Sequence, residues 1–356
     1  MTTINMLSSA DKVKGQGVAS AYLEQVNLVK NGLSDRYQVE INKFMLSDIT
    51  HYHTVDFKHF LSLPFAKLSG KAVGYVHFLP ETVEESLDMP ILFKKAFYKY
   101  MIAFYNKMDY LVTVNPYFID KLCEYGIERD KITYIPNFVS EEDFYPYDIN
   151  KKKEVREKYG ISPNAFVVLG VGQVQTRKGV LDFVEIAKNM PDIQFIWAGG
   201  FSFGKITSGY KELKEIVDSP PENVKFIGIV ERDDMNSVYN MSDVFFLPSY
   251  NELFPMAILE AMNCHLPIVL RDIDIYKNIL FDYYLRANDN KGFEKILNKL
   301  KNDKDNYKLA KKSSIRGSSY YSKEHVLYFW KEFYDGVSND LGTRRFRGRR
   351  YEKKSS

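Results

Sequence analysis

The feature that most limits the possible folds is a strand, a loop, a helix and a second strand around residue 250. The apolar run 244–247 ends at Pro248, and another apolar run covers 266–270. The residues between them have the pattern of a helix whose first turn can hold Pro255, because the missing N–H of proline has no helical partner there. Buried strands that alternate with a helix predict an α/β fold.

Two glutamates mark this segment. Glu252 lies in the loop at the helix entrance, and Glu260 follows eight residues later, about two turns further on. The free amides at a helix start and the positive end of its dipole favour an anion such as a diphosphate. One carboxylate at the mouth and one deeper could bind hydroxyls at the two ends of an extended ligand, a sugar and a ribose. The alternative is an ordinary amphipathic helix with two solvated glutamates.

Length and composition indicate a two-domain chain. The 356 residues are long for a single core, and 45% hydrophobic and 15% aromatic residues can fill two. Cys123 and Cys264 lie far apart without metal-like spacing, which indicates reduced, buried thiols of a cytoplasmic protein. The N-terminus has neither the charge nor the apolar core of a signal peptide, and no apolar run reaches the roughly 18 residues of a membrane span.

Two loops at predicted strand ends in the first half of the chain are candidate ligand sites. Gly15 and Gly17 separate the strand 4–7 from a helix, although the third glycine of a dinucleotide fingerprint is missing. A tight turn explains them equally well. His77 ends the strand 72–77, at the rim where open α/β sheets bind ligands. A structural histidine with satisfied hydrogen bonds is the alternative.

Charged residues in the second half suggest an anion site and raise the question of a metal. Arg177 and Lys178 follow the buried strand 166–172, where they could hold phosphate oxygens; a solvated pair is the alternative. Asp272 and Asp274 form a D-x-D pair, a motif that some transferases of another fold use to bind a divalent cation and a diphosphate. Ordinary loop carboxylates are the favoured interpretation here.

Residues 89–108 form the most amphipathic segment of the chain. One predicted helix face carries Phe93, Phe97, Tyr100, Met101, Phe104 and Met108. Lysines lie opposite this face or at its flanks: Lys94, Lys95, Lys99 and Lys107. Such a helix can lie in a membrane interface, and a helix packed on its own sheet has the same pattern.

The last residues, 341–356, are strongly basic, and we expect them to be disordered. Anionic lipid, RNA or solvent alone could be their partner.

The run from Asp243 to Met262 resembles the signature of glycosyltransferase family four, P-S-x-x-E-x-F-G/P-x-x-x-L-E-A. Lys178 matches the lysine of that family's G-R-x-x-x-K-G loop, whereas Gln173 stands where its arginine is usual. The segment 132–139 resembles its I-P-N-G-V segment, with Phe138 in place of glycine. The resemblance implies a retaining transferase with the GT-B fold, two Rossmann-like α/β domains that face each other across a cleft.

The family also implies a domain plan and roles for individual residues. Residues 1–150 would form an acceptor- and membrane-facing domain, 151–320 a nucleotide-sugar domain, and 321–340 a helix that crosses back. The residues with implied catalytic roles are Glu252, His77 and Lys178. The implied donor-binding residues are Gly17, Arg177, Lys178, Leu253, Phe254, Met256, Glu260 and Ile229. The predicted membrane or acceptor residues are Phe93, Lys94, Lys95, Phe97, Lys99 and Phe104. No metal or other cofactor is expected.

Within the family, segments 5–17 and 75–82 are similar to the diglycosyldiacylglycerol synthases of low-GC Gram-positive bacteria. This similarity implies transfer of glucose or galactose from UDP-glucose or UDP-galactose to monoglucosyldiacylglycerol, on the inner face of the plasma membrane. The implied partners are the glycolipid acceptor and an anionic membrane surface, without nucleic acid. Three alternatives stay open: another acceptor such as a cell-wall, capsule or protein glycan, a membrane- or RNA-binding protein on a degenerate scaffold, and a UDP-sugar epimerase.

Overall fold

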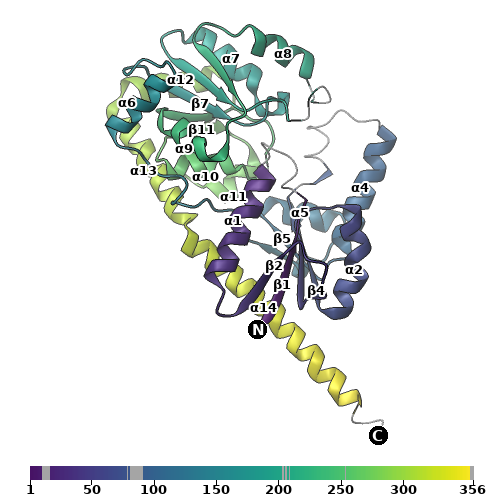
Figure 1. The fold of residues 1–356 in the computed structure, drawn as a ribbon. Coiled ribbons are helices and arrows are strands. Elements are labelled where there is room, and N and C mark those ends of the chain that lie inside the picture. The colour runs from purple at the N-terminus through teal and green to yellow at the C-terminus, as the bar shows by residue number, and fades with distance from the viewer. Residues whose placement is uncertain are drawn as a thin grey trace.

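The protein contains two parallel six-stranded sheets, one in each half of the chain (Figure 1). The computed structural model describes residues 1–9, 17–77, 79–80, 91–202, 204, 207, 209–252 and 254–352, with side chains described outside 17–20 and 342–352. The first sheet comprises β1 (Thr2–Leu7), β2 (Tyr37–Ile41), β3 (Ile49–Tyr52), β4 (Lys71–Val76), β5 (Tyr110–Thr113) and β6 (Ile132–Tyr134). The second comprises β7 (Val167–Val171), β8 (Gln194–Ala198), β9 (Val224–Gly228), β10 (Val244–Leu247), β11 (Ile268–Arg271) and β12 (Leu285–Ala287). The predicted α/β class is confirmed.

Strand order shows where ligands can bind. The order β9-β8-β7-β10-β11-β12 in the second sheet places β7 and β10 at the point where the chain reverses direction across the sheet. In the first sheet, the order β2-β1-β3-β4-β5-β6 places β1 and β3 at that point. Open parallel sheets bind ligands outside the carboxyl ends of the strands at this switch point. The loops after β7 and β10 contain Lys178 and Glu252, so topology brings these two predicted residues together.

Helices cover the faces of both sheets. The first domain contains α1 (Gly17–Gly32), α2 (Phe57–Ser69), α4 (Ile91–Asn106) and α5 (Tyr117–Glu124). The second contains α6 (Ile149–Lys158), α7 (Val180–Asn189), α8 (Tyr210–Asp218), α9 (Arg232–Asn240), α10 (Met256–Asn263), α11 (Asp274–Leu280), α12 (Asn290–Asn302) and α13 (Lys304–Tyr320). Short 3-10 turns lie at Arg129–Lys131 (η2) and Thr176–Lys178 (η3). The long helix α14 (Lys323–Glu352) follows α13.

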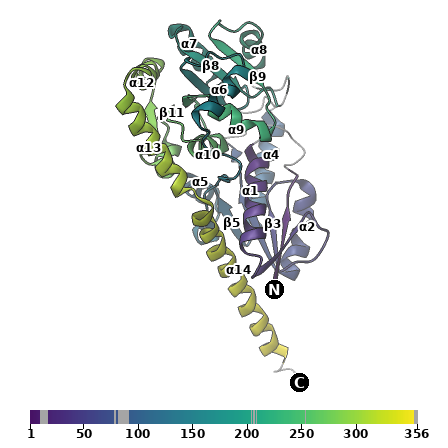
Figure 2. The same cartoon turned by 60° about the vertical axis from the view of Figure 1, so that its left-hand side comes forward.

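Helix α14 returns the chain to the first domain, as Figure 2 shows. Its Tyr334 is fully buried, and its hydroxyl meets His51 Nδ1 at 2.7 Å and accepts a hydrogen bond from Gln25 at 3.3 Å. Trp330 packs beside His51 and Tyr75, each 5.7 Å away between ring centroids. The part of α14 that contains Trp330 and Tyr334 therefore belongs to the core of the first domain.

Helix α14 continues to Glu352, through residues 341–352 of the segment for which the sequence predicts disorder. No proline interrupts this stretch, and arginine is a good helix former. Residues 353–356 lie outside the described residues.

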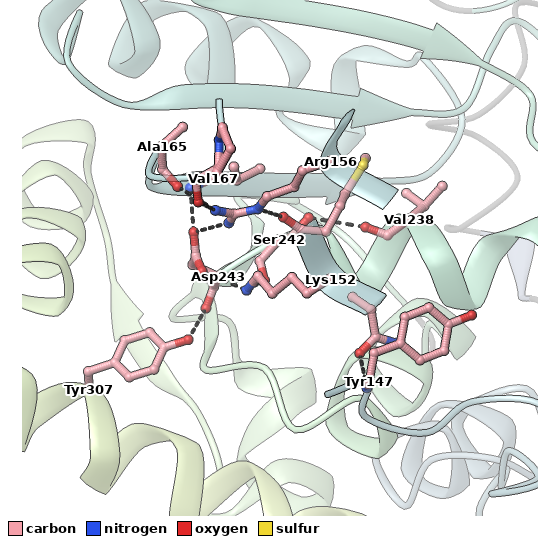
Figure 3. Close-up of polar contacts among 12 residues, drawn as sticks. Tyr147, Lys152, Arg156, Ala165, Val167, Val238, Ser242, Asp243 and Tyr307 are labelled. Atoms are coloured by element: carbon pink, nitrogen blue, oxygen red, sulfur yellow. Dashed lines mark hydrogen bonds and ion pairs between the residues drawn. The ribbon is translucent and has the colours of Figure 1, made fainter. Parts of the chain in front are cut away.

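Residues 149–158, at the junction of the two predicted domains, form helix α6. This helix docks on the second domain through Asp243 (Figure 3). Asp243 accepts hydrogen bonds from Lys152 Nζ and Arg156 Nη2, both at 2.7 Å, and from the Val167 amide at 2.8 Å. Arg156, itself buried, also donates to the Met241 carbonyl at 2.8 Å. Lys152, Arg156 and Asp243 thus form an internal anchor that holds α6 to the second sheet.

Replacing Asp243 by alanine should lower the free energy of unfolding by about 3–5 kcal/mol, because Arg156 would stay buried without its counter-charge. Urea unfolding followed by circular dichroism measures the change. Asp282→Ala is the matched control, since its ion pair with Arg316 is exposed and should contribute at most about 1 kcal/mol. Equal losses in both variants would show that the Asp243 cluster does not anchor α6.

Candidate functional site

The loops after β7 and β10 are joined directly to each other. Ser249 Oγ and the Tyr250 amide donate to the Arg177 carbonyl at 2.9 and 2.7 Å. Gly179 has φ 72°, and a Cβ there would lie 2.3 Å from the Pro248 carbonyl oxygen. Only glycine allows this left-handed turn and the close approach of the two loops. The η3 turn before it therefore presents its two cations to the loop that carries Glu252.

Glu252 is buried among cations. Its Oε1 accepts from Lys178 Nζ at 2.5 Å and from Ser249 Oγ at 2.7 Å, and its Oε2 lies 3.7 Å from Arg177 Nη1. Burial alone would raise the pKa of Glu252, but Lys178 and Arg177 hold it below its ordinary value. Burial lowers the pKa of Lys178, and Glu252 opposes that shift. The geometry thus concentrates one negative and two positive charges at the switch point of the second sheet.

Glu260 occupies a second, separate buried site on α10. Its Oε2 accepts from the Tyr239 hydroxyl at 2.5 Å, and its Oε1 lies 3.5 Å from Arg232 Nη1. Burial raises the pKa of Glu260, while Tyr239 and Arg232 act in the opposite direction. Because α10 begins only at Met256, Glu260 lies about one helical turn from its start. The sequence predicts a separation of about two helical turns between Glu252 and Glu260, but Glu252 lies in the loop before the helix.

His77 follows the last residue of β4 and lies in a cluster of buried aromatic rings. Its ring is 4.1 Å from Tyr75 and 6.0 Å from His53, and His53 is 4.3 Å from His51, between ring centroids. Burial lowers the pKa of His77 to about 3, so the imidazole is neutral near pH 7. In a neutral imidazole one ring nitrogen donates a hydrogen bond and the other accepts one. This suits a residue that orients a hydroxyl group.

A polar bridge connects the cluster of rings around His77 with the loop of Glu252. The Tyr75 hydroxyl donates to Asn137 Oδ1 at 3.3 Å, and Asn137 Nδ2 donates to the Phe254 carbonyl at 3.4 Å. No hydrogen bond or ion pair joins His77 to Glu252 among the described residues. The surroundings of these two predicted catalytic residues are therefore linked through Tyr75, Asn137 and Phe254, while no hydrogen bond joins the two residues themselves.

The other predicted donor residues contribute in different ways. Phe254 and Met256 bury their side chains, which leaves only their backbone for a ligand. Ile229 is 49% exposed and lies against Gly200, as an apolar surface at the edge of the second sheet. Gly17 is the first residue of α1, and Leu253 lies outside the described residues.

The D-x-D carboxylates pair with cations. Asp274 Oδ1 accepts from Lys277 at 2.6 Å, and Asp272 Oδ1 lies 3.7 Å from Arg286 Nη1. Among the residues whose placement is described, no group of three or more His, Cys, Asp or Glu side chains is arranged to hold a metal ion.

The predicted apolar face of the 89–108 helix divides into an exposed start and a buried remainder. Phe93 is 65% exposed, Lys95 and Lys99 are exposed, and Lys94 and Phe97 are partly buried. Phe104 is only 1% exposed and packs against Tyr52 and Phe60. The membrane role predicted for Phe104 is therefore wrong, because α4 uses this part of its face to cover the first sheet.

Helix α2 provides the larger exposed apolar stripe. It lies beside α4 on one side of the first domain (Figure 1), and Phe57 and Tyr100 bring the two helices together at 6.3 Å between ring centroids. The exposed apolar side chains are Phe57, Leu61, Phe65 and Leu68 on α2, and Ile91, Leu92 and Phe93 on α4. We call these seven residues the α2–α4 surface. No helix in the described part of the chain is long and apolar enough to cross a membrane.

Several residues of the site were not predicted from the sequence. His51 lies in the short strand β3 and His53 follows directly after it, and residues two apart along an extended chain point to the same face; this i, i+2 spacing was the available signal. Arg232 and Tyr239 on α9 meet Glu260 only through tertiary packing, so no local pattern identified them.

Comparison with known proteins covers both halves of the chain. The family model described as "glycosyl transferases group 1" matches residues 151–317, and the model described as "glycosyltransferase family 4" matches residues 36–143. The alpha-galactosylglucosyldiacylglycerol synthase of Streptococcus pneumoniae is 46% identical over 332 residues, which are 93% of this chain and 89% of that protein. The processive diacylglycerol alpha-glucosyltransferase of Acholeplasma laidlawii is 28% identical over 227 residues, covering 62% of this chain and 67% of that protein.

Solved structures share the fold at low sequence identity. Anabaena HepE in complex with UDP and glucose superimposes with a TM-score of 0.74 at 15% identity, covering 94% of this chain and all of that chain. The sucrose-phosphate synthase of Thermosynechococcus elongatus gives a TM-score of 0.76 at 14% identity, covering 96% of this chain and all of that chain. These likenesses confirm the predicted GT-B architecture.

The buried histidines predict how stability depends on pH. Burial holds the pKa of His53 well below 6.5, so the unfolded chain binds a proton that the folded chain excludes as the pH falls below about 6.5. His53→Phe should therefore reduce the loss of unfolding free energy between pH 6.5 and 4.5, by up to about 1.4 kcal/mol per pH unit. Urea unfolding at several pH values measures the slope. The same slope in both proteins would mean that His53 does not titrate in this way.

Proposed function

The chain belongs to glycosyltransferase family 4, and from this membership and its site we propose that it transfers a hexose from a UDP-sugar to a glucosyldiacylglycerol, with retention of configuration. The observation that carries the proposal is the buried group of Glu252, Lys178 and Arg177 at the switch point of the second sheet. The near-full-length similarity to a galactosylglucosyldiacylglycerol synthase supports the lipid acceptor. Glucose and galactose both fit the proposal as the donor hexose.

The charges of the site suit the departure of a diphosphate. As the sugar–phosphate bond breaks, negative charge grows on the leaving phosphate and positive charge on the sugar ring. Arg177, Lys178 and the start of α10 would stabilise the phosphate charge. Glu252 would hold a sugar hydroxyl and favour the positive ring. Cations that are fixed before the reaction need no rearrangement as this charge develops, so stabilisation is available at the moment of bond breaking.

Glu260 and His77 would hold the two ends of the donor. Glu260 accepts a hydrogen bond from the Tyr239 hydroxyl on Oε2, which fixes the carboxylate, and its Oε1, 3.5 Å from Arg232 Nη1, would bind the ribose hydroxyls. His77, neutral at its buried position, would orient the transferred sugar from the first domain. The donor would thus contact both domains.

The contacts of Glu252 favour transfer on one face of the sugar. Lys178, Arg177 and Ser249 engage both oxygens of Glu252, so its carboxylate is held by cations and a hydroxyl instead of being aimed as a nucleophile. We therefore favour a path in which the leaving phosphate accepts the proton of the acceptor hydroxyl. No metal is required in this scheme, because protein cations carry the compensating charge.

Purified protein with monoglucosyldiacylglycerol vesicles and UDP-glucose or UDP-galactose should yield a diglycosyl lipid with an α-linked second hexose. Mass spectrometry and the anomeric proton coupling in NMR identify the product. Activity should persist in EDTA. Glu252→Gln should lower kcat by about 10²–10³-fold, as removal of a preorganised electrostatic group does.

Two results would contradict the proposed function, and a third would contradict the proposed mechanism. One is the absence of any diglycosyl lipid with either donor. The second is a β-linked product. The third, loss of activity in EDTA with recovery in magnesium or manganese, would overturn only the metal-free mechanism.

We further propose that the α2–α4 surface docks on an anionic membrane. Its seven apolar side chains offer burial in the interface, and Lys58, Lys95 and Lys99 are exposed on the same two helices. Apolar burial combined with attraction of basic side chains to lipid phosphate is how amphipathic helices bind at an interface. A diacylglycerol acceptor keeps its chains in the bilayer, so the first domain must approach the membrane.

Replacing Leu61 and Phe65 by serine should weaken binding to phosphatidylglycerol vesicles at least about fivefold, and binding of the wild type should weaken with rising salt. Flotation or vesicle sedimentation measures bound protein. Leu309→Ser on α13 is the control, because it removes a similarly exposed leucine from the second domain. If truncation after Leu341 abolishes binding while the double variant binds normally, the basic C-terminal segment is the membrane contact instead.

A further inference from the structure

Arg232 connects the two domains at the deep end of the proposed donor site. It is the first residue of α9 in the second domain, and its Nη2 donates a hydrogen bond to Glu24 on α1 of the first domain. Its Nη1 lies 3.5 Å from Glu260 Oε1. The two carboxylates belong to α1 and α10, which are in contact with each other. One guanidinium thus meets a carboxylate on each side of the domain boundary.

The surroundings of Arg232 fix its position. Its guanidinium carbon lies 5.2 Å from the ring centroid of Phe144, within the range of a cation–π contact. Asp143 is 3.6 Å away, but its side chain is 54% exposed, so solvent screens this pair. Glu24 and Glu260 are both buried, and their interactions with Arg232 are therefore the stronger ones.

Arg232 favours the charged form of both buried carboxylates. Burial raises the pKa of Glu24 to about 7, and Arg232 is the principal group that opposes the shift, while Asp143 and Glu260 add to it. For Glu260, Arg232 and the Tyr239 hydroxyl oppose the same effect of burial, with the Cys264 thiol nearby. A guanidinium can serve two carboxylates at once because its donors form a rigid, two-sided fork.

We propose that Arg232 is a positioning residue that holds Glu260 for the donor ribose and ties this carboxylate to Glu24 of the first domain, so that donor binding and the approach of the two domains stabilise each other. The inference rests on the proposed function in one respect, the assignment of Glu260 to the ribose. Glu24 acts in it only through Arg232. The first turn of α1, which begins at Gly17, would be brought to the donor by the same contact.

The test measures UDP binding by titration calorimetry and the kinetics of transfer. Arg232→Met keeps the apolar stem without the charge, and we expect about a tenfold rise in both the Kd for UDP and the KM for the UDP-sugar. We expect kcat to change by less than about threefold, because Arg232 does not touch the reacting atoms. Arg232→Lys keeps the charge without the fork, so its Kd should lie between those of the wild type and Arg232→Met.

A double-mutant cycle separates this role from a merely structural one. Glu24→Gln should weaken UDP binding about threefold in the wild type but not at all in Arg232→Met, because Glu24 acts through the arginine. Arg316→Met, which breaks an exposed pair within the second domain, is the control and should leave the Kd unchanged.

Two outcomes would overturn the inference alone: an unchanged Kd for UDP in Arg232→Met, or effects of Glu24→Gln that are equal in both backgrounds. A wild-type protein that binds UDP yet makes no glycolipid would overturn the proposed function while leaving this inference intact. A wild-type protein that binds no UDP would overturn both.

Discussion

The buried pair of Lys178 and Glu252 is the interaction on which the site depends. Removing two charges from water costs several kcal/mol per ion, and the attraction between them commonly does no more than balance that cost. The pair is held by a left-handed glycine turn, by Ser249 and by a second cation, Arg177. Such a buried ion pair therefore adds little to the free energy of unfolding, although several groups are needed to hold it. It is better explained as a preorganised set of charges that a ligand enters.

Parallel topology explains why residues far apart in sequence form this set. Lys178 and Glu252 are 74 residues apart, yet β7 and β10 are adjacent strands and their loops leave the same edge. The proposed donor site therefore needs no long or unusual loop. The same rule places His77 at the carboxyl edge of the first sheet, where its neighbour Tyr75 is linked through Asn137 to the second domain.

Much of the fold and part of the site could be predicted from the sequence, for identifiable reasons. Long apolar runs such as 166–172 and 244–247 marked central strands, and the spacing of Glu252 and Glu260 marked the strand–loop–helix unit. Short strands escaped notice: β3 has four residues and β12 three. Periodicity identified the α4 helix, but it could not distinguish a face covered by the sheet, as at Phe104, from an exposed one. Arg232 escaped prediction because its partners come from α1 and α10, far away in sequence.

The return of α14 to the first domain affects how the chain folds during synthesis. His51 and Tyr75 leave the ribosome early, but the rings that complete their packing, Trp330 and Tyr334, lie near the other end of the chain. Domains generally fold in the order in which they are made. Here the second sheet, whose strands span 167–287, can form before the first domain has its final helix. We therefore expect the N-terminal half to be the later one to mature, with the side chains that pack against Trp330 and Tyr334 open to chaperones until α14 has been made.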